Sequence, residues 1–400
     1  MALEPPVFFF FRFPFFTMPF DLTELLHTLR QTAVERDRQG GHATLEKARI
    51  RDAGLLRLAI PQQHGGLEQP WPDIYRLVRQ VATVDSSLAH LLAFHQLQVA
   101  TVLIYGNAEQ QHRWLRRTAD EQGWWGNALN PRDTRLLAQG EGPDFVLDGT
   151  KGFCSGTRGS SYMTVSARHP EGDQPVLGIL ATDAPGIAVQ EDWDPVGQRQ
   201  TDSGSVRFDQ VLLAGTDVMR DHHTPPTVFH TLRNCLAQLV LVNLYLGIAQ
   251  GAQHEARQYA HAEGRPWIAA AVDRATEDPY LLSRMGDMQA QIAAATALAE
   301  RAAYAVQAAW ERGQSLTAAQ RGEVALAVAE AKVIAHRAGL FASQELFEVV
   351  GARGTRASLG YDRFWRNVRT HTLHDPLDYK LQTLGRWALN GELPQPANYG

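Results

Sequence analysis

The sequence predicts an α+β protein of several domains. An N-terminal helical domain and a C-terminal four-helix bundle would flank a central antiparallel β-barrel or sandwich. Three observations lead to this fold class. The chain has 400 residues, too many for one ordinary hydrophobic core. Apolar residues recur at helical spacing before residue 123 and again after residue 227. Between them, short runs rich in Val, Ile, Leu, Phe and Thr alternate with Gly, Pro, Asp and Asn, which is typical of strands and turns.

Residues 18–123 are predicted to form the N-terminal helical domain. Apolar residues recur at helical spacing over about 21–39, 45–53, 71–84, 86–105 and 109–117, and glycines end several of these stretches. Residues 1–17 are expected to be an upstream extension that is disordered or absent from the native protein, with Met18 as the true start. This phenylalanine-rich stretch is too short to span a bilayer, and Arg12 and Pro14 interrupt it.

Residues 124–226 are predicted to form the central β domain. Asp148–Gly149 stands between apolar runs and is interpreted as a tight hairpin turn. The strand that follows ends at Ser155–Gly156, which would place a hydroxyl and exposed backbone amides at a strand edge. Trp193 lies shortly before the polar run TDSGS at 201–205. Each feature also has an ordinary interpretation, a simple hairpin or a loop with one packed tryptophan.

Residues 227–400 are predicted to form the C-terminal bundle. Long helices are expected over 235–262, 282–312 and 318–349, and a short helix is expected after Pro376. The alanine-rich part of the second helix, residues 290–309, indicates close packing between helices. Domains of different class would border a cleft, and small-molecule sites usually form in such places.

The composition excludes several functional classes. The net charge of −5 argues against nucleic acid or a membrane surface as a partner. Cys154 and Cys235 form neither a metal motif nor a disulfide framework, so a reducing cytoplasm is expected. His222–His223 has no third ligand nearby, so this pair is interpreted as solvent-exposed and no metal is expected.

The segment RNVRTHTLHDPLDYK, residues 366–380, carries the strongest chemical signal. His371 and His374 are three residues apart, so a helical backbone would place both imidazoles on one face. Histidine exchanges protons near neutral pH, which makes one of them a candidate catalytic residue, the alternative being a packed or surface histidine. Asp375 precedes Pro376, which predicts an N-cap role for Asp375 with support from Asp378.

Several motifs in a fixed order resemble the acyl-CoA dehydrogenase fold over residues 22–400. These motifs are WWGNA, LDGTKGFCSG, VGQRQTDSGSVRF, GARGT and RFWRNVRT. The segments AVERDRQGG, SLAHLLAFH, ATEDPY and DRFWRNVRTHTLHDP are similar to one branch, the flavin-dependent monooxygenases typified by dibenzothiophene monooxygenase.

The resemblance implies a two-component FMNH2-dependent monooxygenase. A separate FMN reductase would supply the flavin by diffusion, and the enzyme would be a homotetramer. It would form a C4a-hydroperoxyflavin and transfer oxygen to an organosulfur substrate, in a dibenzothiophene-like sulfoxidation.

The resemblance also implies catalytic residues. His374, together with His371, would lie near C4a of the flavin and stabilise or protonate the peroxide. His90 would face the same pocket from the N-terminal domain. Asn127 would form a hydrogen bond near the isoalloxazine or the peroxide, and Ser155 would contact the N5 edge of the ring.

Further residues would bind the cofactor and the substrate. Phe153 would contact the flavin ring and Trp193 would pack on it. Arg265, and Arg353 from a neighbouring subunit, would bind phosphate or ribityl oxygens, while residues 265–280 would close over the flavin. Arg353 stands where the family has a small residue, and an arginine suits a terminal phosphate, which indicates FMN rather than FAD.

The sequence departs from the branch at two places that border the pocket. Phe94 stands where the typical enzyme has a tyrosine, so a hydroxyl is lost from the substrate pocket beside His90. The segment ALNPRDTR, which begins directly after Asn127, also differs. Three alternatives remain open: an amine N-hydroxylase of the same branch, an acyl-CoA dehydrogenase with Asp375 as its base, and a helical scaffold without flavin.

Overall fold

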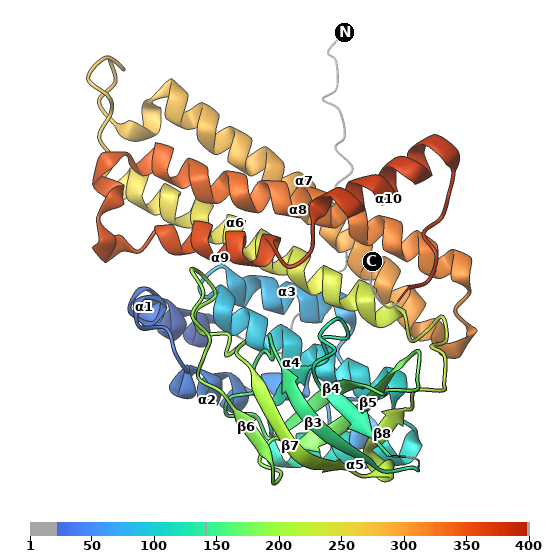
Figure 1. Cartoon of the computed structure of the whole chain (residues 1–400). Helices are drawn as coiled ribbons and strands as arrows, with labels where there is room; N and C mark the ends of the chain where they lie inside the picture. The colour runs from blue at the N-terminus through green and yellow to red at the C-terminus, as the bar shows by residue number, and fades with distance from the viewer. Residues whose placement is uncertain (1–21, 141, 398–400) are drawn as a thin grey trace.

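A computed structural model describes residues 22–140 and 142–397 of the chain (Figure 1). The expectations for residues 1–17 and for Met18 as the start lie outside the described residues. In the described part, helices precede and follow a single eight-stranded sheet. The predicted architecture of a helical N-terminal part, a central β domain and a C-terminal helical bundle is confirmed.

The N-terminal part consists of α1 (Thr23–Gln39), α2 (Thr44–Asp52), α3 (Trp71–Ala82), α4 (Ser86–Tyr105) and α5 (Ala108–Glu121). Asp85 caps α4, because its carboxylate accepts a hydrogen bond from the Leu88 amide at 3.0 Å. Nearly every residue of α4 is buried. Figure 1 shows α3 and α4 between the long C-terminal helices and the sheet. Helix α4 can therefore present side chains to both.

The central sheet is mixed rather than wholly antiparallel. Its strands are β1 (Trp125–Ala128), β2 (Leu137–Gln139), β3 (Phe145–Lys151), β4 (Tyr162–Arg168), β5 (Pro175–Ala181), β6 (Ile187–Val189), β7 (Val206–Leu213) and β8 (Val218–Arg220). Their order is β6-β7-β3-β2-β4-β5-β8, and β1 pairs with β4 in parallel. Strands β2 and β4 also meet in parallel, at Leu137 and Arg168. The other pairings are antiparallel.

The predicted hairpin turn at Asp148–Gly149 is wrong. Strand β3 runs through both residues and is bulged there, where its register against β7 shifts between Leu147 and Gly149. Gly149 has φ +126°, and a Cβ atom at this position would lie 2.2 Å from the carbonyl oxygen of Arg135. At this bulge the backbone needs a glycine because φ is positive, as it is in many tight turns, so the local sequence could not separate the two.

The C-terminal part consists of α6 (Leu232–Ala262), α7 (Pro279–Arg312), α8 (Ala318–Val350), α9 (Asp362–Thr372) and α10 (Leu377–Asn390). The first three are long and pack along one another. Helix α9 lies against α6 and α8, so the bundle has one short helix more than the sequence predicted. As expected, the alanines of α7 make close packing possible, since Ala295, Ala299 and Ala302 are all buried.

One hydrophobic core joins α3 and α4 to the long C-terminal helices, and a second core consists largely of buried residues from the strands of the sheet. Helices α4 and α6 are long and apolar enough to cross a membrane, but 89% of the tested stretch of each is buried inside the protein. Both are therefore core helices.

The expected domain limits, 123/124 and 226/227, fall in connections between elements.

Candidate active site

A cavity of about 530 Å³ lies where α4, the sheet, α6 and the end of α9 meet. This volume is typical of small-molecule sites. Eight of the ten site residues predicted from the sequence line it: His90, Phe94, Asn127, Phe153, Ser155, Trp193, His371 and His374. They come from positions up to 284 residues apart (90 to 374), so the fold brings together what the motifs only suggested.

Two buried histidines stack at the centre of the cavity wall. The ring centroids of His90 on α4 and His371 on α9 are 4.9 Å apart, and Phe94 stacks on His90 at 4.0 Å. Burial, with smaller contributions from neighbouring positive charge, lowers the pKa of His371 to about 3. Burial, together with His371 and His374, also holds the pKa of His90 well below its usual range. Both imidazoles are therefore neutral at pH 7.

Several polar atoms of this cavity have no partner among the described residues. They are both ring nitrogens of His90, Nδ1 of His371 and Oδ1 of Asn127. Leaving a buried polar atom without a hydrogen bond costs about 1–3 kcal/mol. Such atoms are usually satisfied, so their concentration around one cavity indicates that a polar ligand binds there.

His374 follows the end of α9, and its ring is fixed by a carboxylate. Its Nδ1 donates a hydrogen bond to Oδ1 of Asp375 at 3.0 Å. The ammonium of Lys332 on α8 lies 2.5 Å from the same oxygen, and its second partner is the side-chain oxygen of Gln238 on α6. Because a carboxylate only accepts hydrogen bonds, Nδ1 of His374 carries the proton and Nε2 is left for the cavity.

The predicted N-cap role of Asp375 is wrong. Pro376 occupies the cap position of α10, and no side chain caps this helix. Burial raises the pKa of Asp375, but the hydrogen bond from His374 and the charge of Lys332 outweigh it, so the pKa falls below its usual range. A carboxylate held in this way is a poor proton acceptor, which disfavours Asp375 as the base of an acyl-CoA dehydrogenase.

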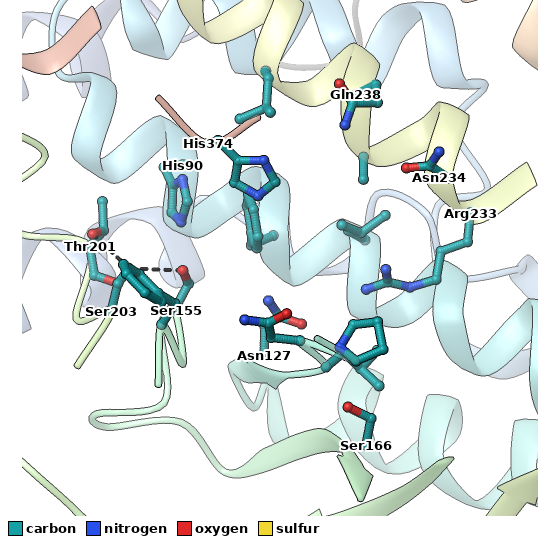
Figure 2. A pocket seen from close by; sticks show the side chains of 18 of the residues that line it. His90, Asn127, Ser155, Ser166, Thr201, Ser203, Arg233, Asn234, Gln238 and His374 are labelled. Carbon is teal, nitrogen blue, oxygen red and sulfur yellow. Dashed lines mark hydrogen bonds between the residues drawn. The ribbon is translucent and has the colours of Figure 1, made fainter. Parts of the chain in front are cut away.

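Hydroxyl groups form a chain at one end of the cavity. Ser203 Oγ lies 2.8 Å from Ser155 Oγ and 2.8 Å from Thr201 Oγ1. The carbonyl oxygen of Ser155 accepts a hydrogen bond from the amide of Asn127 on β1 at 2.9 Å, which places these two predicted residues side by side. Figure 2 shows these three hydroxyl-bearing side chains on the side of the cavity that faces His90 and His374. Ser155 is a predicted site residue, whereas Thr201 and Ser203 belong to the polar run TDSGS, to which the sequence assigned no individual role.

Two aromatic side chains stand beside these hydroxyl groups. Phe153 is 69% exposed and has φ +56°, a conformation that non-glycine residues rarely adopt. Its ring centroid lies 6.1 Å from that of Trp193. Neither the positive φ nor the solvent exposure of Phe153 stabilises the fold. Both are expected if this side chain contacts a ligand in the cavity.

Gln198 holds the segment that carries Trp193. Its carbonyl oxygen accepts a hydrogen bond from the indole of Trp193 at 2.9 Å, and its side-chain amide donates to Ser86 Oγ on α4 at 3.0 Å. Its backbone amide donates to Asn367 Oδ1 on α9 at 2.6 Å. The preceding Gly197 lies against α9 so closely that a Cβ would be 2.2 Å from the carbonyl oxygen of Arg366. No local sequence pattern predicts this role for Gln198, because its partners lie on distant helices.

Arg265 and Arg353 are not among the residues that line the cavity. Both are exposed, in the connections that follow α6 and α8.

The interpretation of His222–His223 as solvent-exposed is correct for His223 only. His222 is 8% exposed and stacks on His169 with ring centroids 3.6 Å apart. Among the described residues, no group of three or more His, Cys, Asp or Glu side chains could hold a metal ion.

The far end of the cavity contains polar residues that were not predicted from the sequence. Arg233, Asn234 and Gln238 on α6 lie there, together with Ser166 from the sheet (Figure 2). Arg220 on β8 also lines the cavity. The available signal was the presence of three polar side chains near the start of an otherwise apolar helix. The apolar character of that helix predicted only a place in the bundle core.

Comparison with known proteins finds matches along most of the chain. The N-terminal, middle and C-terminal domains of acyl-CoA dehydrogenase match residues 25–122, 120–211 and 239–379. The probable FMNH2-dependent monooxygenase SfnC of Pseudomonas putida is 45% identical over 377 residues, which cover 94% of this chain and 95% of SfnC.

This chain belongs to the FMNH2-dependent monooxygenases with the acyl-CoA dehydrogenase fold.

Two solved structures of this monooxygenase family extend the comparison. Methanesulfinate monooxygenase MsuC from Pseudomonas fluorescens has a TM-score of 0.92 and 44% identity, covering 94% of this chain and 98% of MsuC. FMN-bound TdsC from a Paenibacillus species, a dibenzothiophene monooxygenase, has a TM-score of 0.88 and 39% identity, covering 94% and 98%. The predicted membership of this monooxygenase branch is confirmed.

Proposed function

We propose that this chain is the oxygenase of a two-component system that inserts one oxygen atom from O2 into an organosulfur compound. FMN is the proposed cofactor, delivered in its reduced form by a separate reductase. The observation that carries this proposal is the cavity in which neutral His90 and His371, Asn127, Ser155 and His374 meet. It is supported by relatives that are named as FMNH2-dependent and as monooxygenases of sulfur compounds.

The residues of the cavity fit a flavin. Ser155 and Asn127 would bind polar atoms of the ring system, which would satisfy the unpartnered Oδ1 of Asn127. Phe153 and Trp193 would cover the aromatic faces, which accounts for the exposure of Phe153. When bound, reduced FMN would supply the electrons that activate O2.

The histidines would control protons and water beside the flavin. His374, oriented by Asp375, would present Nε2 to the reacting oxygen atoms. Neutral His90 and His371 would each offer one donor and one acceptor without introducing a charge. The apolar side chains around them would exclude water, which would otherwise waste reduced flavin and oxygen.

We further propose that Arg265, and Arg353 from a neighbouring copy, bind the phosphate and ribityl oxygens, with residues 265–280 closing over the flavin. This requires a homo-oligomer, and a tetramer is the form we propose. Large exposed apolar residues on α10 support such an assembly, since Tyr379 is 65% and Leu389 86% exposed. The cytoplasm is the proposed compartment, supported by two unpaired cysteines.

The alternatives are less well supported. An acyl-CoA dehydrogenase would need a free base, whereas the carboxylate of Asp375 is bound by Lys332 and His374. An amine N-hydroxylase would admit a substrate that is cationic at pH 7, which two cavity arginines, Arg220 and Arg233, would repel. A scaffold without flavin would have no use for buried, unpartnered histidines.

The test is isotope incorporation in the reconstituted reaction. The purified protein would be combined with a flavin reductase, NADH, FMN and 18O2, and offered methanesulfinate, dimethyl sulfoxide or dibenzothiophene. Mass spectrometry should find one 18O atom per oxygenation in a product. Product oxygen drawn only from water, or flavin reduction by an acyl-CoA, would contradict the proposed function.

A further inference from the structure

Strand β4 carries two hydroxyl-bearing side chains on one face. Successive residues of a strand point to opposite faces, and Val165 and Ala167 belong to the core of the sheet. Thr164 and Ser166 therefore point the other way. Thr164 Oγ1 donates a hydrogen bond to the side-chain oxygen of Gln98 on α4 at 2.6 Å, so its hydrogen is used within the protein. Ser166, two residues further along, lines the cavity.

Lys151, the last residue of β3, is the partner of Ser166. Its ammonium donates hydrogen bonds to the carbonyl oxygens of Asn130 and Asp133 at 2.5 and 2.8 Å, and to Ser166 Oγ at 3.1 Å. An ammonium has three N–H donors and no acceptor, so these three bonds use all of its hydrogens. The side chain is 1% exposed, so water does not compete for these bonds.

The bond from Lys151 fixes the direction of the Ser166 hydroxyl. Because the ammonium can only donate, Ser166 Oγ is the acceptor, and its own hydrogen points elsewhere. Within the described part of the chain, no group accepts that hydrogen. Figure 2 shows Ser166 below Asn127, away from Ser155. Since Ser166 is buried and lines the cavity, its hydrogen is left for a ligand there.

The charge of Lys151 makes this hydroxyl a strong donor. The carboxylate of Asp133 bonds to the guanidinium of Arg135 and to the amide of Gly152, whereas the ammonium receives only the carbonyl oxygen of Asp133. The three acceptors of the ammonium are therefore neutral. Hydrogen bonds in a chain polarise one another, so an atom that accepts from Ser166 meets a better donor than an isolated serine.

Apolar residues of the adjacent strand stand beside Ser166. Leu177 on β5 pairs with Ser166 on β4, and Pro175 lies on the same face of β5, two residues before Leu177. Both line the cavity. A directed donor beside apolar groups fixes the orientation of a ligand. The flavin proposed above uses the end of the cavity at Ser155, so the substrate is the ligand that would meet Ser166.

We propose that Ser166 is a substrate-binding residue that donates a hydrogen bond to an oxygen atom of the substrate, and that Lys151 is the positioning residue that directs this hydroxyl. The inference rests on the proposed oxygenase function. It adds that the substrate carries an acceptor oxygen besides the atom that is oxygenated. A compound without such an acceptor would leave the buried O–H of Ser166 without a partner, which costs affinity.

Methyl phenyl sulfide and methyl phenyl sulfoxide are the probes for this acceptor. Both are neutral and keep a lone pair on sulfur, and the sulfoxide adds one oxygen atom. Calorimetry would measure their affinities for the protein saturated with oxidised FMN, which cannot activate O2. Ser166→Ala removes the donor. Ser161→Ala, at an exposed position directly before β4, is the matched control. Fluorescence titration would measure the affinities for FMN and riboflavin.

We expect Ser166→Ala to weaken sulfoxide binding by about 5- to 30-fold and to leave sulfide binding within about threefold, as the loss of one hydrogen bond predicts. Ser161→Ala should match the wild type, and flavin affinities should not change in either variant. Unchanged sulfoxide binding in Ser166→Ala, equal losses for both probes, or no sulfoxide binding to the wild type would overturn the proposal. A loss of FMN and riboflavin affinity would assign the hydroxyl to the cofactor and also overturn it.

The pH dependence of sulfoxide binding tests Lys151 in the wild-type protein. Burial lowers the pKa of Lys151 to about 8, with Arg135 acting in the same direction and Asp133 and Cys154 raising it. A neutral amine can accept the hydrogen of Ser166, which would turn the donor away from the cavity. Sulfoxide affinity should therefore fall as the pH rises through about 8, while sulfide affinity stays within about threefold. Sulfoxide affinity that does not change with pH would overturn the role of Lys151.

These measurements stay separate from the proposed oxygenase function, because none of them requires turnover. A loss of sulfoxide binding confined to Ser166→Ala supports the substrate-binding role even if no 18O enters any sulfur compound. Unchanged sulfoxide binding in Ser166→Ala overturns that role even if oxygenation is observed.

Discussion

The ammonium of Lys332 lies 2.5 Å from Oδ1 of Asp375, although the two residues are 43 positions apart and on different elements. Because the same carboxylate oxygen accepts the Nδ1 proton of His374, a buried cation on α8 fixes a histidine ring at the cavity. The side chain of Lys332 is only 1% exposed, so water cannot replace it. Orientation of His374 therefore depends on residues that do not line the cavity themselves.

Asp375→Asn should test this orientation. The amide keeps the shape of the side chain, but it loses the charge and can present either an oxygen or an NH2 group to His374. We expect turnover to fall by about 10- to 100-fold, the usual effect of removing a partner that orients a functional histidine. In the flavin-free protein, 15N NMR should show His374 changing from the Nδ1–H tautomer to a mixture.

Asp378→Asn is the matched control, because Asp378 is exposed in the first turn of α10. It should retain wild-type turnover and the Nδ1–H tautomer. Full turnover in Asp375→Asn with an unchanged His374 spectrum would show that the carboxylate does not orient this ring.

The pH dependence of turnover should show the deprotonation of the Lys332 ammonium. Burial lowers the pKa of Lys332 to about 8, although neighbouring Asp375 raises it. Below pH 8 the ammonium is charged and holds Asp375, and as the pH rises through 8 this ion pair is lost. We therefore expect kcat to decline above about pH 8. The folded lysine binds fewer protons than the unfolded one between pH 8 and 10.5, so its contribution to folding stability rises over that window while activity falls.

Lys332→Arg identifies the group, because arginine stays protonated to well above pH 12. The alkaline decline should move to higher pH or disappear in this variant. Lys380 also approaches Asp375 and is buried, so Lys380→Arg is the control and should leave the decline in place. An identical profile in wild type and Lys332→Arg would assign the decline to another group.

Features that depend on local sequence could be predicted, whereas features that depend on contacts between distant residues could not. Helical periodicity over α4, α6, α7 and α8 predicted these helices, because each buries a continuous apolar surface. The cavity histidines were found because they occur in recognisable motifs. The role of Asp375 was missed because local rules favour a cap before Pro376, and nothing near it in sequence points to Lys332. Arg233 was missed for a similar reason, since only the fold turns that face of α6 toward the sheet.

The packing of α7 against its neighbours should be sensitive to the size of the side chain at position 302. Ala302 is fully buried in α7, where small side chains let the helix approach its neighbours. Ala302→Leu should lower the free energy of unfolding by about 1–3 kcal/mol, because the added methyl and methylene groups must displace packed neighbours. Urea denaturation followed by circular dichroism measures this. Ala294→Leu, on the exposed side of the same helix, should have a small effect; equal stability of both variants would contradict close packing at Ala302.

Gln198 should control flavin affinity by holding the segment that carries Trp193. Its side chain joins the Trp193 segment to α4 through Ser86 and to α9 through the carbonyl oxygen of Asn367 at 3.3 Å. Gln198→Ala removes these bonds while the backbone contact to Trp193 can remain. Since each net hydrogen bond contributes about 1 kcal/mol, we expect FMN and riboflavin affinities to fall together by about tenfold.

Fluorescence titration of the purified variant measures both affinities. Gln190→Ala is the control, because Gln190 is exposed and its side chain bonds only to the carbonyl oxygen of nearby Ala188 among the described residues. A loss for FMN but not for riboflavin would place the effect at the phosphate rather than at the ring. Unchanged affinity for both flavins, in a variant with wild-type thermal stability, would show that Trp193 does not need this support to bind the cofactor.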